Sequence, residues 1–159
     1  MRLDEFARFG LMVPPGAGAT EVHAITADSR AVTPGAIFFA LPGSRADGRR
    51  FIADAIARGA VAVAVPEGEE PPEDGAVPVL TGLRLRRSLA LAAAGMHPGQ
   101  PAQAVAVTGT NGKTSTVDFV RQLATLAGRR AASVGTLGVV AEGLPPEATL
   151  TTPDPVALH

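Results

Sequence analysis

The stretch that decides the fold reads Val107-Thr108-Gly109-Thr110-Asn111-Gly112-Lys113-Thr114-Ser115. A short apolar run at residues 104–107 leads into it, and apolar positions with helical spacing follow over residues 113–127. A strand, a glycine-rich turn and a helix in this order predict a loop whose backbone N–H groups converge on phosphate oxygens, at the positive end of the helix dipole. The sequence therefore predicts a nucleotide-binding loop of the P-loop kind.

The residues of this loop have candidate roles. Those predicted to bind phosphate are Gly109, Thr110, Asn111, Gly112, Lys113, Thr114 and Ser115. Lys113 is the candidate catalytic residue because its ammonium can reach β- and γ-phosphates, and the Thr114 hydroxyl is the candidate Mg²⁺ ligand. Relative to the pattern GxxxxGK[ST], Val107 stands in place of the first glycine. The loop predicts a nucleoside triphosphate, and leaves open whether the γ-phosphate passes to water, to a protein or to a small carboxylate.

Strand and helix patterns alternate along the whole chain, which predicts an α/β protein. Residues 36–41 and 60–65 are apolar runs typical of buried strands. Residues 77–80 fit an edge strand, because Pro78 cannot donate to a ladder. Further strands are predicted within 22–25, 104–107 and 131–140, and helices over 49–58 and 84–96.

The best linker candidate is His97-Pro98-Gly99-Gln100-Pro101. It predicts an N-terminal domain over residues 1–97, a linker over 98–101 and part of a P-loop domain over 102–159. An open α/β sheet usually has about five or six strands, and three elements after residue 102 are too few to build one. We therefore expect apolar surface of residues 102–159 to face water. This expectation implies a piece of a longer enzyme, inactive by itself, or a partner chain that covers residues 102–159.

Composition excludes several classes of protein. Fourteen Lys and Arg against fifteen Asp and Glu leave a net charge of −1, so a nucleic-acid-binding surface is not expected. The absence of cysteine excludes disulfides, thiolate metal sites and cysteine nucleophiles. No apolar stretch approaches the roughly 20 residues that span a bilayer, and the first residues do not resemble a signal peptide. We expect a soluble, cytoplasmic protein that acts on small molecules and not at a membrane.

Residues 109–115 closely resemble the ATP loop of the Mur ligase family, whose members join amino acids to the UDP-linked precursor of peptidoglycan. Val107 agrees with this resemblance, because the altered first glycine is the family's own form of the loop. Three further segments resemble the family in the same order: Thr26-Ala27-Asp28-Ser29-Arg30 with residues 34–40, Ala46-Asp47-Gly48-Arg49-Arg50 with residues 51–60, and Gly135-Thr136-Leu137-Gly138 with Leu150-Thr151-Thr152-Pro153. The last pair is similar to the branch that adds the third residue of the stem peptide.

The resemblance implies a ligase that needs ATP, bound by residues 109–115, and Mg²⁺. UDP-MurNAc-L-Ala-D-Glu would rest mainly on the N-terminal domain; the implied substrate-binding residues are Ala27, Ser29, Ser44, Arg45, Ala46, Thr151 and Thr152. The γ-phosphoryl group would pass to the D-Glu carboxylate, and the amino group of diaminopimelate or lysine would displace phosphate from the acyl phosphate. The protein's part in such a reaction is to position the transferred group and neutralise its charge.

Three functions stay open on the sequence alone. The first is an amide ligase of this kind. The second is a module that binds the UDP-linked precursor or ATP without turnover. The third, suggested only by residues 105–127, is an unrelated P-loop NTPase or kinase, and it predicts no binding of uridine nucleotides.

Overall fold

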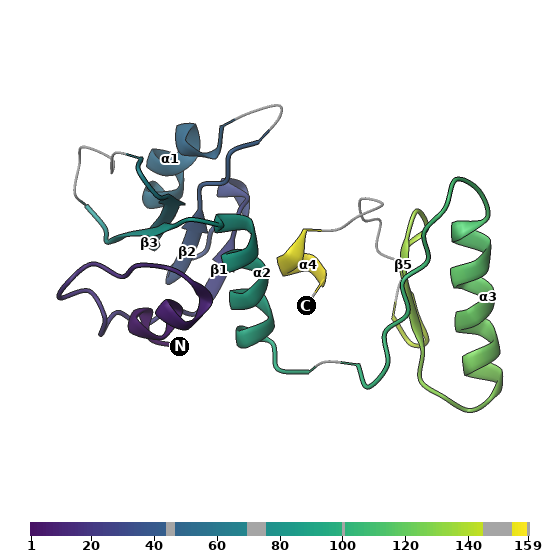
Figure 1. Cartoon of the computed structure of the whole chain (residues 1–159). Helices are drawn as coiled ribbons and strands as arrows, with labels where there is room; N and C mark the ends of the chain where they lie inside the picture. The colour runs from purple at the N-terminus through teal and green to yellow at the C-terminus, as the bar shows by residue number, and fades with distance from the viewer. Residues whose placement is uncertain (44–46, 70–75, 100, 145–153, 159) are drawn as a thin grey trace. The chain divides into compact units, whose positions relative to one another are not determined.

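Figure 1 shows a computed structural model of the 159-residue chain, which describes residues 1–43, 47–69, 76–99, 101–144 and 154–158. The chain divides into two compact units, residues 1–100 and residues 101–158. The first contains a four-stranded sheet and the second a two-stranded sheet, with helices in both, so the predicted α/β class is confirmed. None of the helices in these described ranges is long and apolar enough to cross a membrane.

Four parallel strands build the first unit, in the order β1 (Ala24–Thr26), β2 (Ala36–Phe39), β3 (Ala60–Pro66) and β4 (Val79–Gly82). The two apolar runs are confirmed as the central strands β2 and β3. The strand predicted at 22–25 is displaced along the chain, and β4 is the predicted edge strand, beginning just after Pro78. All side chains of β2 are buried, as a strand covered on both faces requires.

A register shift in the ladder decides which side chains of β3 share a face. Ala36 pairs with Ala60 whereas Ile37 pairs with Ala62, so one residue of β3 is left out of the ladder. The face that carries Phe38 forms one core with the helix that follows β2. Its buried members are Val32, Ala36, Phe38, Ala40, Ile52, Ala55, Ala60, Val63 and Val65.

Helices cover both faces of this sheet. The short helix α1 (Ile52–Ala57), preceded by the 3₁₀ helix η3 (Gly48–Phe51), packs on β3 as part of that core. The helix ends at Ala57, and Gly59 follows with a φ of +97°, which suits glycine. Helix α2 (Leu85–Met96) and the 3₁₀ helix η1 (Leu3–Phe9) pack against each other on the other face. The 3₁₀ helix η2 (Ser29–Ala31) belongs to the connection that leads along the chain from β1 to β2. The helices predicted over 49–58 and 84–96 are confirmed with shorter bounds.

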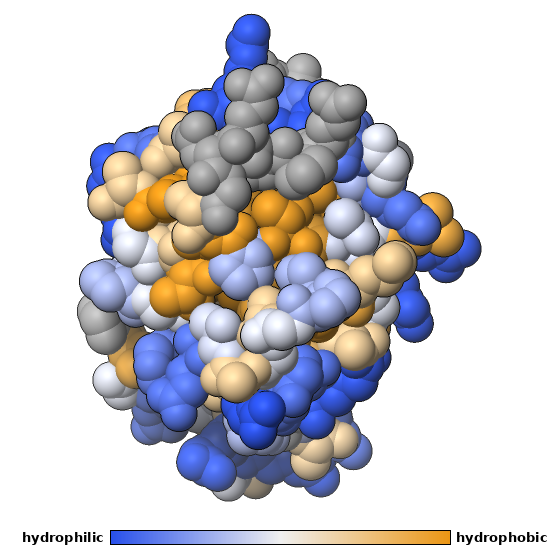
Figure 2. Space-filling view, turned by 90° about the vertical axis from the view of Figure 1, so that its left-hand side faces the viewer, coloured by the Kyte–Doolittle hydropathy of each residue, from blue (hydrophilic) through white to orange (hydrophobic). Residues whose placement is uncertain are grey.

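The hydrophobic core of the described residues lies in the first unit. Its largest fully buried side chains include Phe6, Phe38 and Phe39. On the face of the molecule that Figure 2 shows, apolar side chains gather at the centre and hydrophilic side chains surround them.

The second unit contains α3 (Lys113–Leu126), β5 (Ala132–Gly135), β6 (Gly138–Ala141) and the short helix α4 (Pro155–Leu158). The helix predicted over 113–127 is confirmed. The single strand predicted over 131–140 is wrong, because the chain turns back at Thr136 and Leu137 to form an antiparallel hairpin. Gly138, with a φ of +84°, completes the bend in a conformation that glycine adopts without strain.

The strand predicted at residues 104–107 is also wrong. Residues 103–107 have no regular secondary structure, and Val105 is 75% exposed. A strand needs a neighbour that receives its backbone hydrogen bonds. No strand within residues 101–144 pairs with this run, so its apolar composition alone does not produce a strand.

One side of α3 packs on β5, and the other side faces solvent. The exposed apolar side chains of α3 are Phe119, Val120, Leu123 and Leu126, between 47% and 83% exposed. The expectation that apolar surface of this segment faces water is therefore confirmed. That a longer chain or a partner chain covers it stays a prediction.

Candidate functional site

The predicted phosphate loop leads directly into α3. Gly109 has a φ of +143° and Gly112 a φ of +78°, and both values favour glycine. Gly112 is the N-cap of α3, and its carbonyl oxygen accepts from the N–H of Thr116 at 2.9 Å. The two glycines therefore turn the chain so that Lys113 and Thr114 stand in the first turn of a 14-residue helix, at the positive end of its dipole.

The ammonium of Lys113 lies over the loop. Nζ donates a hydrogen bond to the carbonyl oxygen of Gly109 and another, at 3.3 Å, to that of Thr110. The side chain thus reaches back over the residues whose backbone is predicted to hold phosphate. Thr110, Asn111 and Ser115 are exposed around it, so the structure brings all the predicted phosphate-binding residues together.

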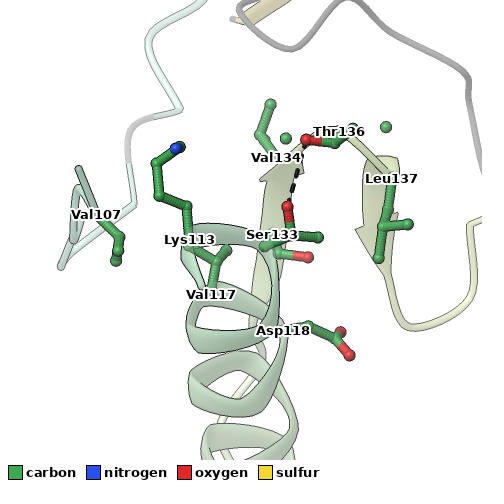
Figure 3. Close-up of a pocket in the computed structure, with 11 residues that line it drawn as sticks. Val107, Lys113, Val117, Asp118, Ser133, Val134, Thr136 and Leu137 are labelled. Atoms are coloured by element: carbon green, nitrogen blue, oxygen red, sulfur yellow. Dashed lines mark hydrogen bonds between the residues drawn. The ribbon is translucent and has the colours of Figure 1, made fainter. Parts of the chain in front are cut away.

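A pocket of about 110 Å³ lies between the start of α3 and the β5–β6 hairpin (Figure 3). Lys113 and Thr114 line it from the helix, Ser133 and Thr136 from the hairpin, and Val107 from the segment before the loop. The hydroxyl oxygens of Thr114 and Thr136 are within hydrogen-bond distance of each other, which the dashed line marks. The pocket therefore presents one cation and several hydroxyl groups, which suits a phosphate group and a hard metal ion.

Asp118 also lines this pocket, one turn of α3 below Thr114. Its Oδ1 accepts from Arg121 Nη2 at 2.8 Å and its Oδ2 from Gln122 Nε2 at 2.7 Å. The hydrogen bond from Arg121, followed by that from Gln122, lowers the pKa of Asp118 below its usual range. The carboxylate is therefore ionised at neutral pH, and Arg121 balances its charge.

In the first unit, the predicted substrate residues Ala27 and Ser29 lie just after the carboxyl end of β1. This end of β1 lies beside that of its parallel neighbour β2. Ligands of open parallel sheets usually bind at this edge. Between Ala27 and Ser29, Asp28 accepts from the backbone N–H of Arg30 at 3.0 Å and from its guanidinium at 2.7 Å. The side-chain hydrogen bond from Arg30 lowers the pKa of Asp28, and the pair fixes the turn.

Ser29 is only 7% exposed, and it begins η2, which packs against α1. The pKa of Asp54 is lowered first by the hydrogen bond from Arg58 and then by that from Ser29. A hydroxyl that donates to a carboxylate keeps lone pairs for a second partner. The remaining predicted substrate residues, Ser44, Arg45, Ala46, Thr151 and Thr152, lie outside the described residues.

Each of the two units matches a family model of known proteins. Residues 21–97 match the model described as "Mur ligase family, catalytic domain", and residues 107–159 match the "Mur ligase middle domain". The chain belongs to the Mur ligase family.

Its curated relatives include UDP-N-acetylmuramoyl-L-alanyl-D-glutamate–2,6-diaminopimelate ligases. That of Bradyrhizobium diazoefficiens is 46% identical over 159 residues, which is all of this chain and 32% of the relative. That of Mesorhizobium japonicum is 54% identical over 140 residues, 87% of this chain and 28% of the relative. These are MurE ligases, the branch to which the sequence was similar. The chain spans about a third of the length of the curated relatives it matches.

Solved structures give the same fold. A UDP-N-acetylmuramoyl-L-alanyl-D-glutamate–2,6-diaminopimelate ligase matches 99% of this chain with a TM-score of 0.73 and 26% identity, over 32% of its own chain. A MurF ligase from Thermotoga maritima in complex with ADP matches 70% of this chain with a TM-score of 0.53 and 26% identity, over 24% of its own chain.

Thr136 and Asp118 are pocket residues that the sequence did not identify as site residues. Asp118 has the spacing of an ordinary exposed helix residue, so no pattern distinguishes it. The sequence does contain a signal for Thr136, which the sequence analysis used only as part of the family resemblance. Thr136 is a polar residue between Gly135 and Gly138, and a two-residue turn places it at the tip of a hairpin.

Proposed function

We propose that this chain supplies the uridine-precursor site and the ATP loop of a ligase that adds 2,6-diaminopimelate to UDP-MurNAc-L-Ala-D-Glu. The observation that carries the proposal is the pocket at the start of α3, where the Lys113 ammonium and the Thr114 hydroxyl stand beside a loop with two positive-φ glycines. The names of the curated relatives support the choice of substrate and of diaminopimelate. Residues 1–97 then form the precursor-binding domain, and residues 102–159, after the linker at 98–101, begin the ATP-binding domain.

The residues of the loop would act on the terminal phosphates of ATP. Backbone N–H groups of residues 109–115 bind phosphate oxygens at the helix N-terminus. Lys113 balances the charge of the γ-phosphoryl group as it moves from ADP to the D-Glu carboxylate, and its ammonium leaves the Gly109 and Thr110 carbonyls to do so. The acyl phosphate is then attacked by the amino group of diaminopimelate, a C–N bond forms, and inorganic phosphate leaves with the C–O bond electrons.

The donor set fits Mg²⁺. Thr114 carries an exposed hydroxyl in the first turn of α3, with the Thr136 hydroxyl beside it, and Mg²⁺ prefers oxygen ligands, usually with several waters and substrate phosphates. Within the described residues, no group of three or more histidines and carboxylates offers an alternative metal site. Thr114 would hold the ion, which would neutralise phosphate charge when bound.

On the first unit, Ala27 and Ser29 would contact the uridine end of the substrate, with Ser44, Arg45 and Ala46 from the loop after β2. Support comes from the position of both segments after adjacent parallel strands. Thr151 and Thr152 would contact the substrate near the reacting carboxylate, by the family resemblance. Because the proposed reaction consumes ATP and a UDP-linked precursor, we place the protein in the cytoplasm.

Calorimetric titration of the 159-residue chain with UDP-MurNAc-L-Ala-D-Glu, and separately with Mg·ATP, tests the proposal. We expect binding of both ligands. A folded chain that binds Mg·ATP but no uridine ligand would contradict the ligase assignment and favour an unrelated P-loop protein. A phosphate-release assay with both substrates and diaminopimelate distinguishes binding alone from turnover.

A further inference from the structure

The pocket at the start of α3 contains a carboxylate as well as a cation. Among the described residues that line it, Asp118 is the one carboxylate, in the same wall as Lys113 and Thr114. Figure 3 shows its carboxylate group on the hairpin side of α3. A carboxylate repels the phosphate groups that this pocket is proposed to bind. A phosphate ligand that carries its own cation is therefore favoured over a bare one.

Asp118 lies one helical turn from the candidate Mg²⁺ ligand. Thr114 and Asp118 are four positions apart in α3, so their side chains project from the same face of the helix. One turn measures about 5.4 Å along the helix axis. A water bound to Mg²⁺ at about 2.1 Å, with a hydrogen bond of about 2.8 Å beyond it, spans a similar distance. The spacing of the two residues therefore suits one direct ligand and one acceptor for a metal-bound water.

The carboxylate of Asp118 is held in place and keeps an acceptor site. Oδ1 accepts from Arg121 Nε at 3.2 Å and from Arg121 Nη2 at 2.8 Å, and Oδ2 accepts from Gln122 Nε2 at 2.7 Å. An ionised carboxylate can accept about four hydrogen bonds, so Oδ2 retains a lone pair for a further donor. The side chain is 26% exposed, which leaves such a donor access to it.

We propose that Asp118 is a positioning residue for the Mg²⁺ of Mg·ATP, which accepts a hydrogen bond from a water bound to the ion. The inference rests on the proposed function, in which Thr114 holds the ion and the loop binds the phosphates. Mg²⁺ usually keeps several of its waters in proteins, and partners of the groups around a metal strengthen its binding. Asp118 then favours ATP with its metal over ATP without it, because its charge attracts the ion and repels bare phosphate.

The alternative role for Asp118 is a structural ion pair with Arg121. A pair with this i, i+3 spacing stabilises a helix, and it would act equally on both forms of ATP. Arg121→Gln separates the two roles, because it removes the ion pair and leaves the carboxylate in place. A structural role needs both partners, whereas the positioning of a metal needs Asp118 alone.

The test measures affinity for ATP by calorimetry, once with Mg²⁺ and once with EDTA. Asp118→Asn keeps the shape of the side chain and removes its charge. It is expected to lower affinity for Mg·ATP about three- to tenfold and to raise affinity for metal-free ATP about twofold. The ratio of the two affinities should therefore fall roughly tenfold.

Two further variants serve as controls for this ratio. Arg121→Gln is expected to leave it unchanged or to raise it. Glu142→Gln removes one negative charge at an exposed position of the same unit and should leave it unchanged. Circular dichroism of each variant checks that its helices are retained.

A ratio that falls in Asp118→Asn alone supports the inference. Equal changes of both affinities in Asp118→Asn, or the same fall of the ratio in Arg121→Gln, would assign the effect to the ion pair and overturn the proposal. The same fall in Glu142→Gln would assign it to charge at a distance and overturn it too. An unchanged ratio in Asp118→Asn would overturn the inference and leave the proposed function intact, whereas an unaltered chain that binds no Mg·ATP would overturn both.

Discussion

The hydroxyl oxygens of Thr114 and Thr136 lie 3.3 Å apart, although 22 positions separate the two residues in the sequence. Thr114 belongs to the first turn of α3, and Thr136 to the turn between β5 and β6. Their approach depends on the packing of the helix on the hairpin. The hairpin turn is therefore part of the candidate ATP pocket. A substitution at Thr136 tests the pocket at a residue outside the loop motif of residues 109–115.

Thr136→Val keeps the size of the side chain and removes its hydroxyl. We expect affinity for Mg·ATP to fall about three- to tenfold, the effect of losing one hydrogen-bonding group, while Thr136→Ser keeps most of it. Thr116→Val, at an exposed position of α3, is the control and should leave affinity unchanged. Equal effects of Thr116→Val and Thr136→Val in calorimetry would remove Thr136 from the site.

Lys113→Ala removes the cation that lies over the phosphate loop. Loss of charge-assisted hydrogen bonds to phosphate is expected to weaken Mg·ATP binding about ten- to hundredfold. Arg130→Ala removes one positive charge from an exposed position of the same unit and is expected to change binding little. Intact ATP binding by Lys113→Ala would show that the loop assignment is wrong.

Phe38→Ala tests the core of the first unit. Phe38 is completely buried on the face that α1 covers, so its loss should lower the free energy of unfolding by about 3–5 kcal/mol. Phe51→Ala, at a side chain that is 42% exposed, should cost about 1–2 kcal/mol. Because the chain has no Trp or Tyr, urea unfolding is best followed by circular dichroism. Similar losses for both variants would contradict the assigned core.

The pH dependence of the turn after β1 follows from Asp28. Its pKa is lowered in the folded chain, chiefly by the side-chain hydrogen bond from Arg30. The stabilisation is therefore present above the ordinary carboxyl pKa of about 4 and is lost as pH falls through the lower folded-state value. NMR titration of the Asp28 carboxyl group should show a midpoint below its ordinary value, and Arg30→Gln should raise it. A midpoint unaffected by Arg30→Gln would contradict the pairing.

Hydrogen exchange tests the absence of a strand at residues 104–107. These amides have no ladder partner in the described part of the second unit, so they should exchange much faster than those of β2 and β3. Slow exchange across residues 104–140 in a monomer would contradict both this reading and the expectation that a further segment or chain covers α3.

Local pattern predicted the elements whose structure depends mainly on local causes. Residues 36–39 form a strand between Pro-Gly pairs, and α3 begins where Gly112 precedes Lys113. The two wrong predictions have different causes. Residues 104–107 have strand composition, but no strand among the described residues pairs with them. Residues 131–140 contain a local turn signal, Gly135 and Gly138, which the prediction of a single strand left out. The loop of residues 109–115 was predictable because its glycines set its conformation locally. The contact between Thr136 and Thr114 was not, because it depends on how the hairpin packs on α3.

Every buried hydrophobic side chain among the described residues falls between Leu3 and Ala93. Domains of a growing chain fold as units, the N-terminal one first. The first unit therefore has its complete interior once α2 has left the ribosome, before the residues of the phosphate loop emerge. The first unit can thus be finished during synthesis, and the second unit is added to a part that is already folded.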